Sequence, residues 1–252
     1  MLKDLTPKKI LPYYVVGSIV FVAIGFSIAI TCGHLLPDVK LSTFSLYHGI
    51  VEIFGILFIL SAVIFTIVKN GFDKQSIINT WKKDKFISLA ILFCAIAEIL
   101  KFVPVVSPFA LGGFFITWIF LISYTFKIKK FKKKHLIPLL IFALISVIYY
   151  FTFHWELQAK TGLMGLLYKI FVPLYILLLT LGVWTSFCFI NERKSIFYII
   201  GCLIFFLSDL IVINEVATGT TNPTIFFLVW ITYLPAIFLI SFTDAEFLNY
   251  KI

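Results

Sequence analysis

Eight apolar stretches alternate with short polar connections along the chain. A window of about 19 residues, which crosses roughly 30 Å of hydrocarbon as a helix, places them at residues 11–33, 44–69, 86–104, 107–127, 135–154, 163–190, 195–215 and 223–244. None shows the alternating polarity of a membrane-barrel strand. Because lipid offers the backbone no hydrogen-bond partner, the pattern predicts an all-α, polytopic membrane protein. We expect a bundle of eight transmembrane helices in a single domain, residues 1–252.

Two of these predicted helices have informative flanks. The first follows a basic start, MLKDLTPKK, but its apolar run is about twice that of a signal peptide, and no A-x-A cleavage site follows it. We therefore expect it to be retained. Only the segment VPVVSP separates the third and fourth stretches. Its two prolines predict a tight helical hairpin.

The composition agrees with a bilayer location. Hydrophobic residues make up 61% of the chain and charged residues 13%, with a mean hydropathy of +1.07, whereas a soluble domain carries about 25% charged residues. Most of the 21 Lys and Arg residues, including the cluster KIKKFKKK, fall in connections that would share one side of an eight-helix protein. The positive-inside rule then predicts that both termini are cytoplasmic.

The net charge of +9 is explained by short basic loops beside an anionic leaflet. No nucleic-acid recognition module is evident, so we expect no nucleic-acid partner. The expected location is the bacterial cytoplasmic (inner) membrane. The chain also lacks a Walker A loop, a G-x-S-x-G elbow and an HExxH motif, so no metal and no cofactor is predicted.

Ionisable residues within the apolar stretches are the candidates for chemistry, because such residues are rare in membranes and usually face the bundle interior. Glu98 and Asp209 lie too deep to reach water along their own helices, so we expect them to meet in a polar cavity, where Glu52 would be a third carboxyl. The full set consists of His48, Glu52, Glu98, Lys101, Lys169 and Asp209.

Each of the other charged positions also has a structural interpretation. Lys169 lies near a helix end and would extend its ammonium to the interface, as long cationic side chains do. Lys101 would either do the same or pair with Glu98 at i,i+3. His48 and Glu52 share a helix face near the outer boundary, where both would be hydrated.

The end of the chain resembles a known family. The stretch GCLIFFLSDLIVINEV and the following FFLVWITYLPAIFLISF are similar to the last two helices of the lysoplasmalogenase family, called YhhN in bacteria and related to vertebrate ether-lipid hydrolases. The shared positions are Gly201, Phe205, Ser208 and Asp209, with Tyr233 in the final helix. VPLYILLLTLGVW resembles the preceding helix. LFCAIAEIL and LGGFFITWIFLISYTF resemble the family's earlier acidic helix and its successor.

The resemblance is strongest over residues 86–245. It carries over to Ser208 and Asp209, and also to Glu98 and Tyr233. Three features depart from the family pattern. Ala97 and Glu98 stand where the family usually has Gly-Asp, Ile237 stands where it has Gln, and no His is evident near Trp118.

The resemblance implies a membrane-embedded hydrolase that cleaves the vinyl-ether bond of lysoplasmalogen-type lysolipids to a fatty aldehyde and a glycerophospho-alcohol. Vinyl ethers hydrolyse by carbon protonation, which requires a strong general acid. Two carboxyls in a low-dielectric site can divide the acid and base roles. Asp209 and Glu98 are the expected catalytic pair, and the acid is not assigned between them.

The remaining candidates would bind the substrate. Tyr233 and Trp230 would stabilise a cation or donate a hydrogen bond, and Lys101 or Lys169 would meet a lysolipid phosphate. The full expected substrate-binding set is Tyr233, Ser208, Trp230, Lys101, Lys169, Glu52 and His48. The expected partners are a membrane lipid or lysolipid, the bilayer and a second copy of the chain.

Two other classes of function remain open. The helix YHGIVEIFGILFI resembles the membrane part of bacterial sensor proteins, although residues 1–252 contain no kinase, cyclase or other output domain. Carboxyls at the membrane midplane are also typical of proton-coupled transporters. No inverted repeat of the kind found in many transporters is evident.

Overall fold

The computed structural model describes residues 41–101, 110–131, 133–152, 154–190, 196–218 and 223–243, together with five residues of the N-terminal segment (14, 16, 17, 20 and 23). This described part is helical throughout and contains no strand. Its α-helices are α2 (Leu41–Val68), α3 (Lys74–Lys101), α4 (Ala110–Ile128), α5 (Leu136–Thr152), α6 (His154–Ala159), α7 (Gly162–Ser186), α8 (Ile196–Thr218) and α9 (Pro223–Ser241). The short 3-10 helices Lys133–His135 and Phe187–Phe189 precede α5 and follow α7.

The apolar helices agree with a membrane protein. By length and composition, the segments Ala110–Ile128, Gly165–Phe189 and Ile196–Asn214 are each able to cross a bilayer, and the segments Glu52–Val68, Leu136–Thr152 and Leu228–Ser241 are shorter but apolar. The predicted first span, 11–33, and the hairpin at 103–108 lie largely outside the described residues. The count of eight spans and the cytoplasmic placement of both termini stay predictions.

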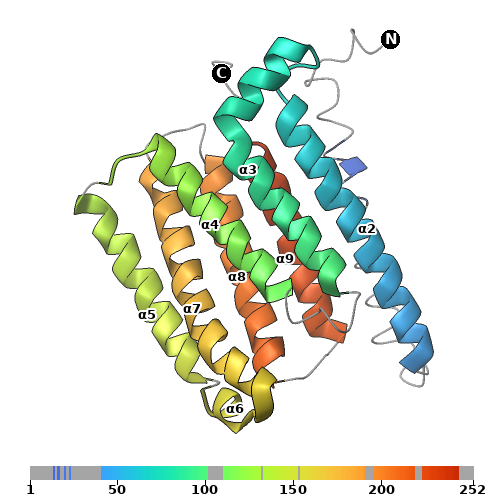
Figure 1. Ribbon diagram of the computed structural model, residues 1–252, viewed down its shortest axis with the longest axis vertical. Coiled ribbons are helices and arrows are strands. Elements are labelled where there is room, and N and C mark those ends of the chain that lie inside the picture. Colours follow the sequence, from blue (N-terminus) through green and yellow to red (C-terminus); the bar gives the residue numbers. More distant parts are fainter. Residues whose placement is uncertain are drawn as a thin grey trace.

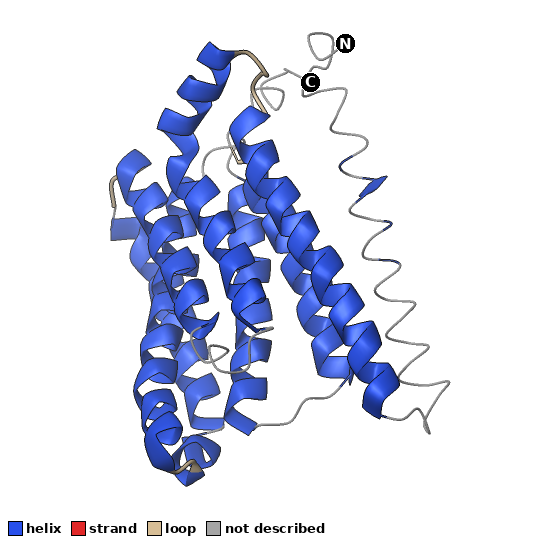
Figure 2. Cartoon of the chain, turned by 45° about the vertical axis from the view of Figure 1, so that its right-hand side comes forward, coloured by secondary structure: helices blue, strands red, loops and turns tan. Residues whose placement is uncertain are grey.

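Six helices form a closed ring. Going around it, α2 packs on α3, α3 on α4, α4 on α7, α7 on α8, α8 on α9, and α9 back on α2. Figure 1 shows this order, with α5 outside the ring against α7 and the short α6 at one end. The helices run roughly side by side (Figure 2). Side chains from α3, α4, α7, α8 and α9 therefore meet in the interior of the ring.

Helix α3 is longer than its apolar stretch predicts. The Asp73 carboxylate accepts a hydrogen bond from the Ser76 backbone N–H at 2.9 Å, which caps the helix start. Hydrogen bonds from the Ser76 side chain and backbone also hold the pKa of the Asp73 carboxyl below its usual value. The helix consequently begins at Lys74 and runs through a polar segment before its apolar part.

Small residues allow two pairs of helices to approach closely. A Cβ at Gly201 of α8 would lie 2.8 Å from Ile240 Cγ1 and 3.1 Å from the Ala236 carbonyl oxygen, both on α9. A Cβ at Gly113 of α4 would lie 2.8 Å from the Ala97 Cβ of α3. Small residues are favoured where membrane helices meet because dispersion contacts replace the hydrophobic effect there. Ala97 directly precedes Glu98 on α3, and Gly201 lies about two turns before Asp209 on α8.

A buried ion pair ties three helices together at one end of the ring. Lys69, directly after α2, lies 2.9 Å from an Asp84 carboxylate oxygen of α3, and both side chains are fully buried. The Lys69 ammonium also donates to the backbone carbonyls of Ser241 and Thr243, at the end of α9. The charge pattern counts Lys69 among the basic residues expected on the cytoplasmic side. The structure instead shows it satisfying the exposed carbonyl end of a helix, where a cation is favoured.

This pair predicts a non-additive stability effect. Lys69→Met removes one partner and leaves the Asp84 charge buried, which costs roughly 3–5 kcal/mol in comparable pairs. The double variant Lys69→Met with Asp84→Leu removes both charges and should unfold at a higher temperature than the single variant in detergent. A double variant that loses the sum of the two single losses would contradict the coupling.

Candidate active site

The carboxyl of Asp209 is held at the centre of the ring by two hydrogen bonds. The Trp118 indole N–H of α4 donates to Asp209 Oδ2 at 2.6 Å, and the Tyr175 hydroxyl of α7 donates to the same oxygen at 2.7 Å. All three side chains are at least 98% buried. A single carboxyl thus joins α8 to two other helices of the ring.

The two oxygens of this carboxyl differ. Both donors reach Oδ2, and none of the described residues donates to Oδ1. Because Oδ2 already accepts two hydrogen bonds, a proton on this carboxyl is best placed on Oδ1. Oδ1 is then the atom from which a proton would leave. The two donors would stabilise the carboxylate that remains.

The Trp118 indole is fixed on both faces. Its ring stacks on Phe205 of α8 with the centroids 5.0 Å apart and the planes 16° from parallel. A glycine, Gly182 of α7, provides the space for the ring, since a Cβ there would lie 2.0 Å from Trp118 Cε3. The direction of the N–H toward Asp209 therefore depends on the absence of a side chain at Gly182.

The second candidate carboxyl has a different environment. Both oxygens of Glu98, on α3, accept hydrogen bonds from the Lys101 ammonium, at 3.0 and 2.9 Å. Glu98 is 2% exposed, and the ammonium also lies 5.0 Å from the centre of the Phe114 ring. The predicted i,i+3 pairing is thus present. Glu98 and Lys101 both lie within electrostatic range of Asp209.

Tyr233 of α9 lies between these groups. Its ring packs against Phe205 at 5.5 Å and against Phe114 at 6.0 Å, each measured between centroids. Its hydroxyl is buried beside the Cys94 thiol, a weak hydrogen-bonding group, and meets no partner at full hydrogen-bond geometry among the described residues. Glu98 and Asp209 both act on it electrostatically. An unpartnered hydroxyl in this position is available to bind a ligand.

Two further predicted residues serve contacts between helices. The Ser208 hydroxyl donates to the Val229 carbonyl oxygen at 3.3 Å, which links α8 to α9. The Trp230 ring fills the space above Gly55 of α2, where a Cβ would lie 2.1 Å from it. The same ring also meets Tyr233 edge-on at 5.8 Å.

Glu52 and Lys169 form no hydrogen bond with Asp209. Glu52 is buried on α2, one turn before the glycine that receives Trp230. Lys169 is half-buried on α7, roughly 9 Å along the helix axis from Tyr175. The side chain of His48 lies outside the described part of the chain.

The Asp209 partners themselves, Trp118 and Tyr175, were not predicted. Both lie near the middle of apolar helices, whereas Trp and Tyr in membrane helices are enriched at the interfaces. That displacement from the interface is the sequence signal that would have indicated them. Among the described residues, no three His, Cys, Asp or Glu side chains group as a metal site requires. What the cluster offers is acid–base chemistry.

The glycine beneath Trp118 yields a test with a matched control. Gly182→Ala adds a methyl group that must displace the indole and break its hydrogen bond to Asp209, so unfolding in detergent should occur at a lower temperature, with a loss of about 1–3 kcal/mol. The intrinsic tryptophan fluorescence should shift as well. Gly112→Ala, where an added Cβ meets no atom within 4 Å, should not lower the unfolding temperature, because Ala favours a helix over Gly, and should leave the fluorescence unchanged. Equal effects of the two substitutions would contradict the account of Trp118.

Comparison with known proteins identifies a family for the chain segment that contains these residues. A family model described as the YhhN family matches residues 50–243, which includes most of α2 and so begins earlier than the expected resemblance. No curated protein and no solved structure matches the chain. The matched segment contains Asp209, Glu98, Tyr233 and both donors to Asp209. Because it covers well over half of the sequence, the chain belongs to the YhhN family.

Proposed function

We propose that the protein is a membrane-embedded hydrolase that cleaves the vinyl-ether bond of lysoplasmalogen-type lysolipids. Family membership supports a lysoplasmalogenase-like membrane protein. The observation that carries the proposal is the pair of unlike carboxyls, one held by neutral donors and one held by a cation. Such a difference in environment assigns separate acid and base roles.

Asp209 is the general acid in this mechanism. It is buried and bonded to two neutral donors, and burial without an ion-pair partner favours the protonated form of a carboxyl. With Oδ2 occupied by Trp118 and Tyr175, the proton resides on Oδ1. After transfer, the two donors stabilise the carboxylate without any rearrangement, as preorganised dipoles do.

Glu98 is the ionised partner. The Lys101 ammonium bonds both of its oxygens, which keeps the carboxylate charged despite its burial. A carboxylate in electrostatic range of the reacting centre stabilises positive charge there and accepts a proton from water. Tyr233 contributes its unpartnered hydroxyl to the same space.

The reaction then proceeds in three steps. Asp209 protonates the alkene carbon distant from the ether oxygen, and the carbon bonded to that oxygen becomes part of an oxocarbenium ion. Water attacks this carbon while Glu98 takes one of the water protons, which gives a hemiacetal. The bond from the hemiacetal carbon to the glycerol oxygen then breaks, the hemiacetal hydroxyl loses its proton and the glycerol oxygen gains one, so the products are a fatty aldehyde and a glycerophospho-alcohol. The proton that Glu98 took from water returns to Asp209, which restores the site with one water consumed.

Substrate binding would draw on the cationic and aromatic side chains near the site. Lys169, near the start of α7, would meet the lysolipid phosphate as a point charge. Trp230 and Tyr233 would face the developing cation, since aromatic faces attract positive charge.

Aldehyde release from a lysoplasmalogen by the purified protein in detergent tests the proposed reaction. Asp209→Asn and Glu98→Gln preserve shape but remove the acid and the base, so each should lower kcat by about 10²–10⁴-fold, the usual contribution of a positioned acid or base. Glu156→Gln changes an exposed carboxyl on α6 and should leave the rate unchanged. A stable wild-type protein that releases no aldehyde from choline or ethanolamine lysoplasmalogens would refute the proposal.

The role of Lys101 gives a separate prediction. Lys101→Met leaves Glu98 buried without a cation, which favours protonation and removes the base, so kcat should fall and the pH–rate profile should shift to higher pH. Lys101→Arg retains a cation and should recover most of the rate. An unchanged pH profile in Lys101→Met would contradict the assignment of Glu98 as the ionised group.

A further inference from the structure

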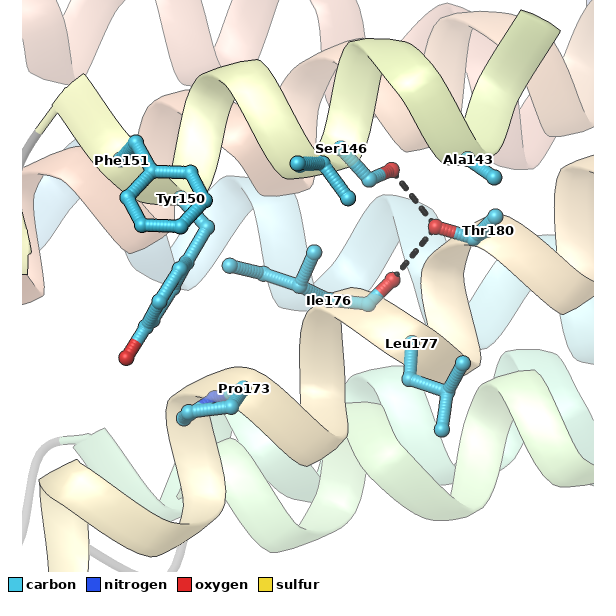
Figure 3. A pocket seen from close by; sticks show the side chains of 9 residues that line it. Ala143, Ser146, Tyr150, Phe151, Pro173, Ile176, Leu177 and Thr180 are labelled. Carbon is cyan, nitrogen blue, oxygen red and sulfur yellow. Dashed lines mark hydrogen bonds between the residues drawn. The ribbon is translucent and has the colours of Figure 1, made fainter. Parts of the chain in front are cut away.

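A groove runs along the outside of the ring between α5 and α7. It has a volume of about 250 Å³, and apolar side chains of both helices form most of its wall. Figure 3 shows Tyr150 and Phe151 of α5 on one side, with Pro173 and Leu177 of α7 on the other. From Ala143 to Phe151 the groove follows α5 for roughly 12 Å along the helix axis.

The sequences of the two helices explain why a gap remains. Helix α5 buries only Phe142 and Ser146 among its described side chains, so most of its surface stays exposed beside the contact with α7. Pro173 lies inside α7 and has no N–H, which removes one backbone hydrogen bond from the helix facing the groove. At the floor, Thr180 donates to the Ile176 carbonyl oxygen at 2.8 Å and its hydroxyl lies 2.6 Å from Ser146 (Figure 3).

The groove opens onto an exposed apolar surface, as a groove that faces bilayer hydrocarbon would. Its rim residues Val147, Phe151 and Leu177 are 52%, 64% and 55% exposed, and α5 and α7 are both apolar helices of a membrane protein. Because the floor hydroxyls already bond each other, the groove presents no free polar group there. Its volume falls below the roughly 300–1,000 Å³ of small-molecule sites, so it suits a hydrocarbon chain and not a whole lipid.

One end of the groove is suited to the polar part of a lipid. The Tyr150 hydroxyl lies 2.9 Å from His154 Nδ1 at the α5–α6 junction. Next to it, Trp155 of α6 is 78% exposed. Tyrosine and tryptophan side chains gather at the boundary between hydrocarbon and head groups. The groove thus runs from an interfacial aromatic and histidine pair toward the apolar interior.

We propose that this groove is a binding site for one acyl chain of a bilayer phospholipid. The chain lies between α5 and α7, with the glycerol end at the Tyr150–His154 pair. It supplies the dispersion contacts that the two helices leave unmade, and it fixes α5 against the ring. The site is separate from the Asp209 cluster and does not depend on the proposed hydrolase activity.

Bound lipid would act on the part of the molecule that supports Asp209. Tyr149, beside the groove residue Tyr150, donates to the Leu210 backbone carbonyl of α8. On α7, the groove residue Ile176 comes directly after Tyr175, which donates a hydrogen bond to Asp209. A chain in the groove therefore packs against the outer side of both connections.

Photolabelling of the full chain tests the proposal. The probe is a phosphatidylethanolamine with a diazirine in the middle of one acyl chain, added to the detergent-purified protein and mapped by mass spectrometry. We expect labelling at Val147, Phe151 and Leu177 that saturates and is competed by unlabelled phosphatidylethanolamine. Ile64 of α2, which is 62% exposed, reports the general lipid layer and should be labelled without saturation. Equal, non-saturable labelling at both places would overturn the proposal.

A filled groove provides the matched variant. Ala143→Phe places a ring in the groove and should abolish the saturable labelling together with the rise in unfolding temperature that added phosphatidylethanolamine gives the wild type. Leu144→Phe enlarges the next residue, which is 61% exposed and outside the groove, and should retain both. Wild-type protein whose unfolding temperature does not respond to the lipid, or an Ala143→Phe variant that keeps the saturable labelling, would refute the site.

Discussion

Two hydrogen bonds to one oxygen of Asp209 are the constraint around which the interior of the ring is organised. Trp118 and Tyr175 come from different helices, and both direct their donors at Oδ2. Their positions depend in turn on Phe205, which stacks on the indole, and on Gly182, which makes room for it. A buried polar network of this kind is stable only when its members are satisfied. Within it, Asp209 Oδ1 and the Tyr233 hydroxyl accept or donate no hydrogen bond among the described residues, and we propose that a ligand binds there.

Two buried acids of α3 have a different environment from Asp209. Asp84, in the first half of the helix, pairs with Lys69, and Glu98, near the end of the helix, pairs with Lys101. An ionised carboxylate in a membrane protein requires such a partner because its desolvation is costly. Asp209 has neutral donors in place of a cation. The contrast between paired and unpaired carboxyls separates the acid from the base in the proposed mechanism.

The apolar pattern predicted the positions of the described long helices to within a few residues, except at α3, and it did not predict the short α6. There the Asp73 cap begins the helix in a polar segment that a hydropathy window excludes. Charged residues within apolar stretches indicated Glu98 and Asp209 as candidates. The i,i+3 spacing of Glu98 and Lys101 indicated that they pair, and the mid-span positions of both carboxyls indicated that they are buried. The pattern gave no order of helices around the ring. The Lys69–Asp84 pair and the Trp118 and Tyr175 donors arise from contacts between distant segments, which no local periodicity encodes.

In the proposed mechanism, Asp209 carries a proton while Glu98 is ionised. Infrared spectroscopy of the purified protein near neutral pH tests these two protonation states directly. A protonated carboxyl in an apolar environment gives a C=O stretching band that is separate from the carboxylate bands. We expect this band to be present in the wild type, lost in Asp209→Asn and retained in Glu98→Gln. A band that persists in Asp209→Asn and disappears in Glu98→Gln would reverse the roles of the two residues and contradict the account.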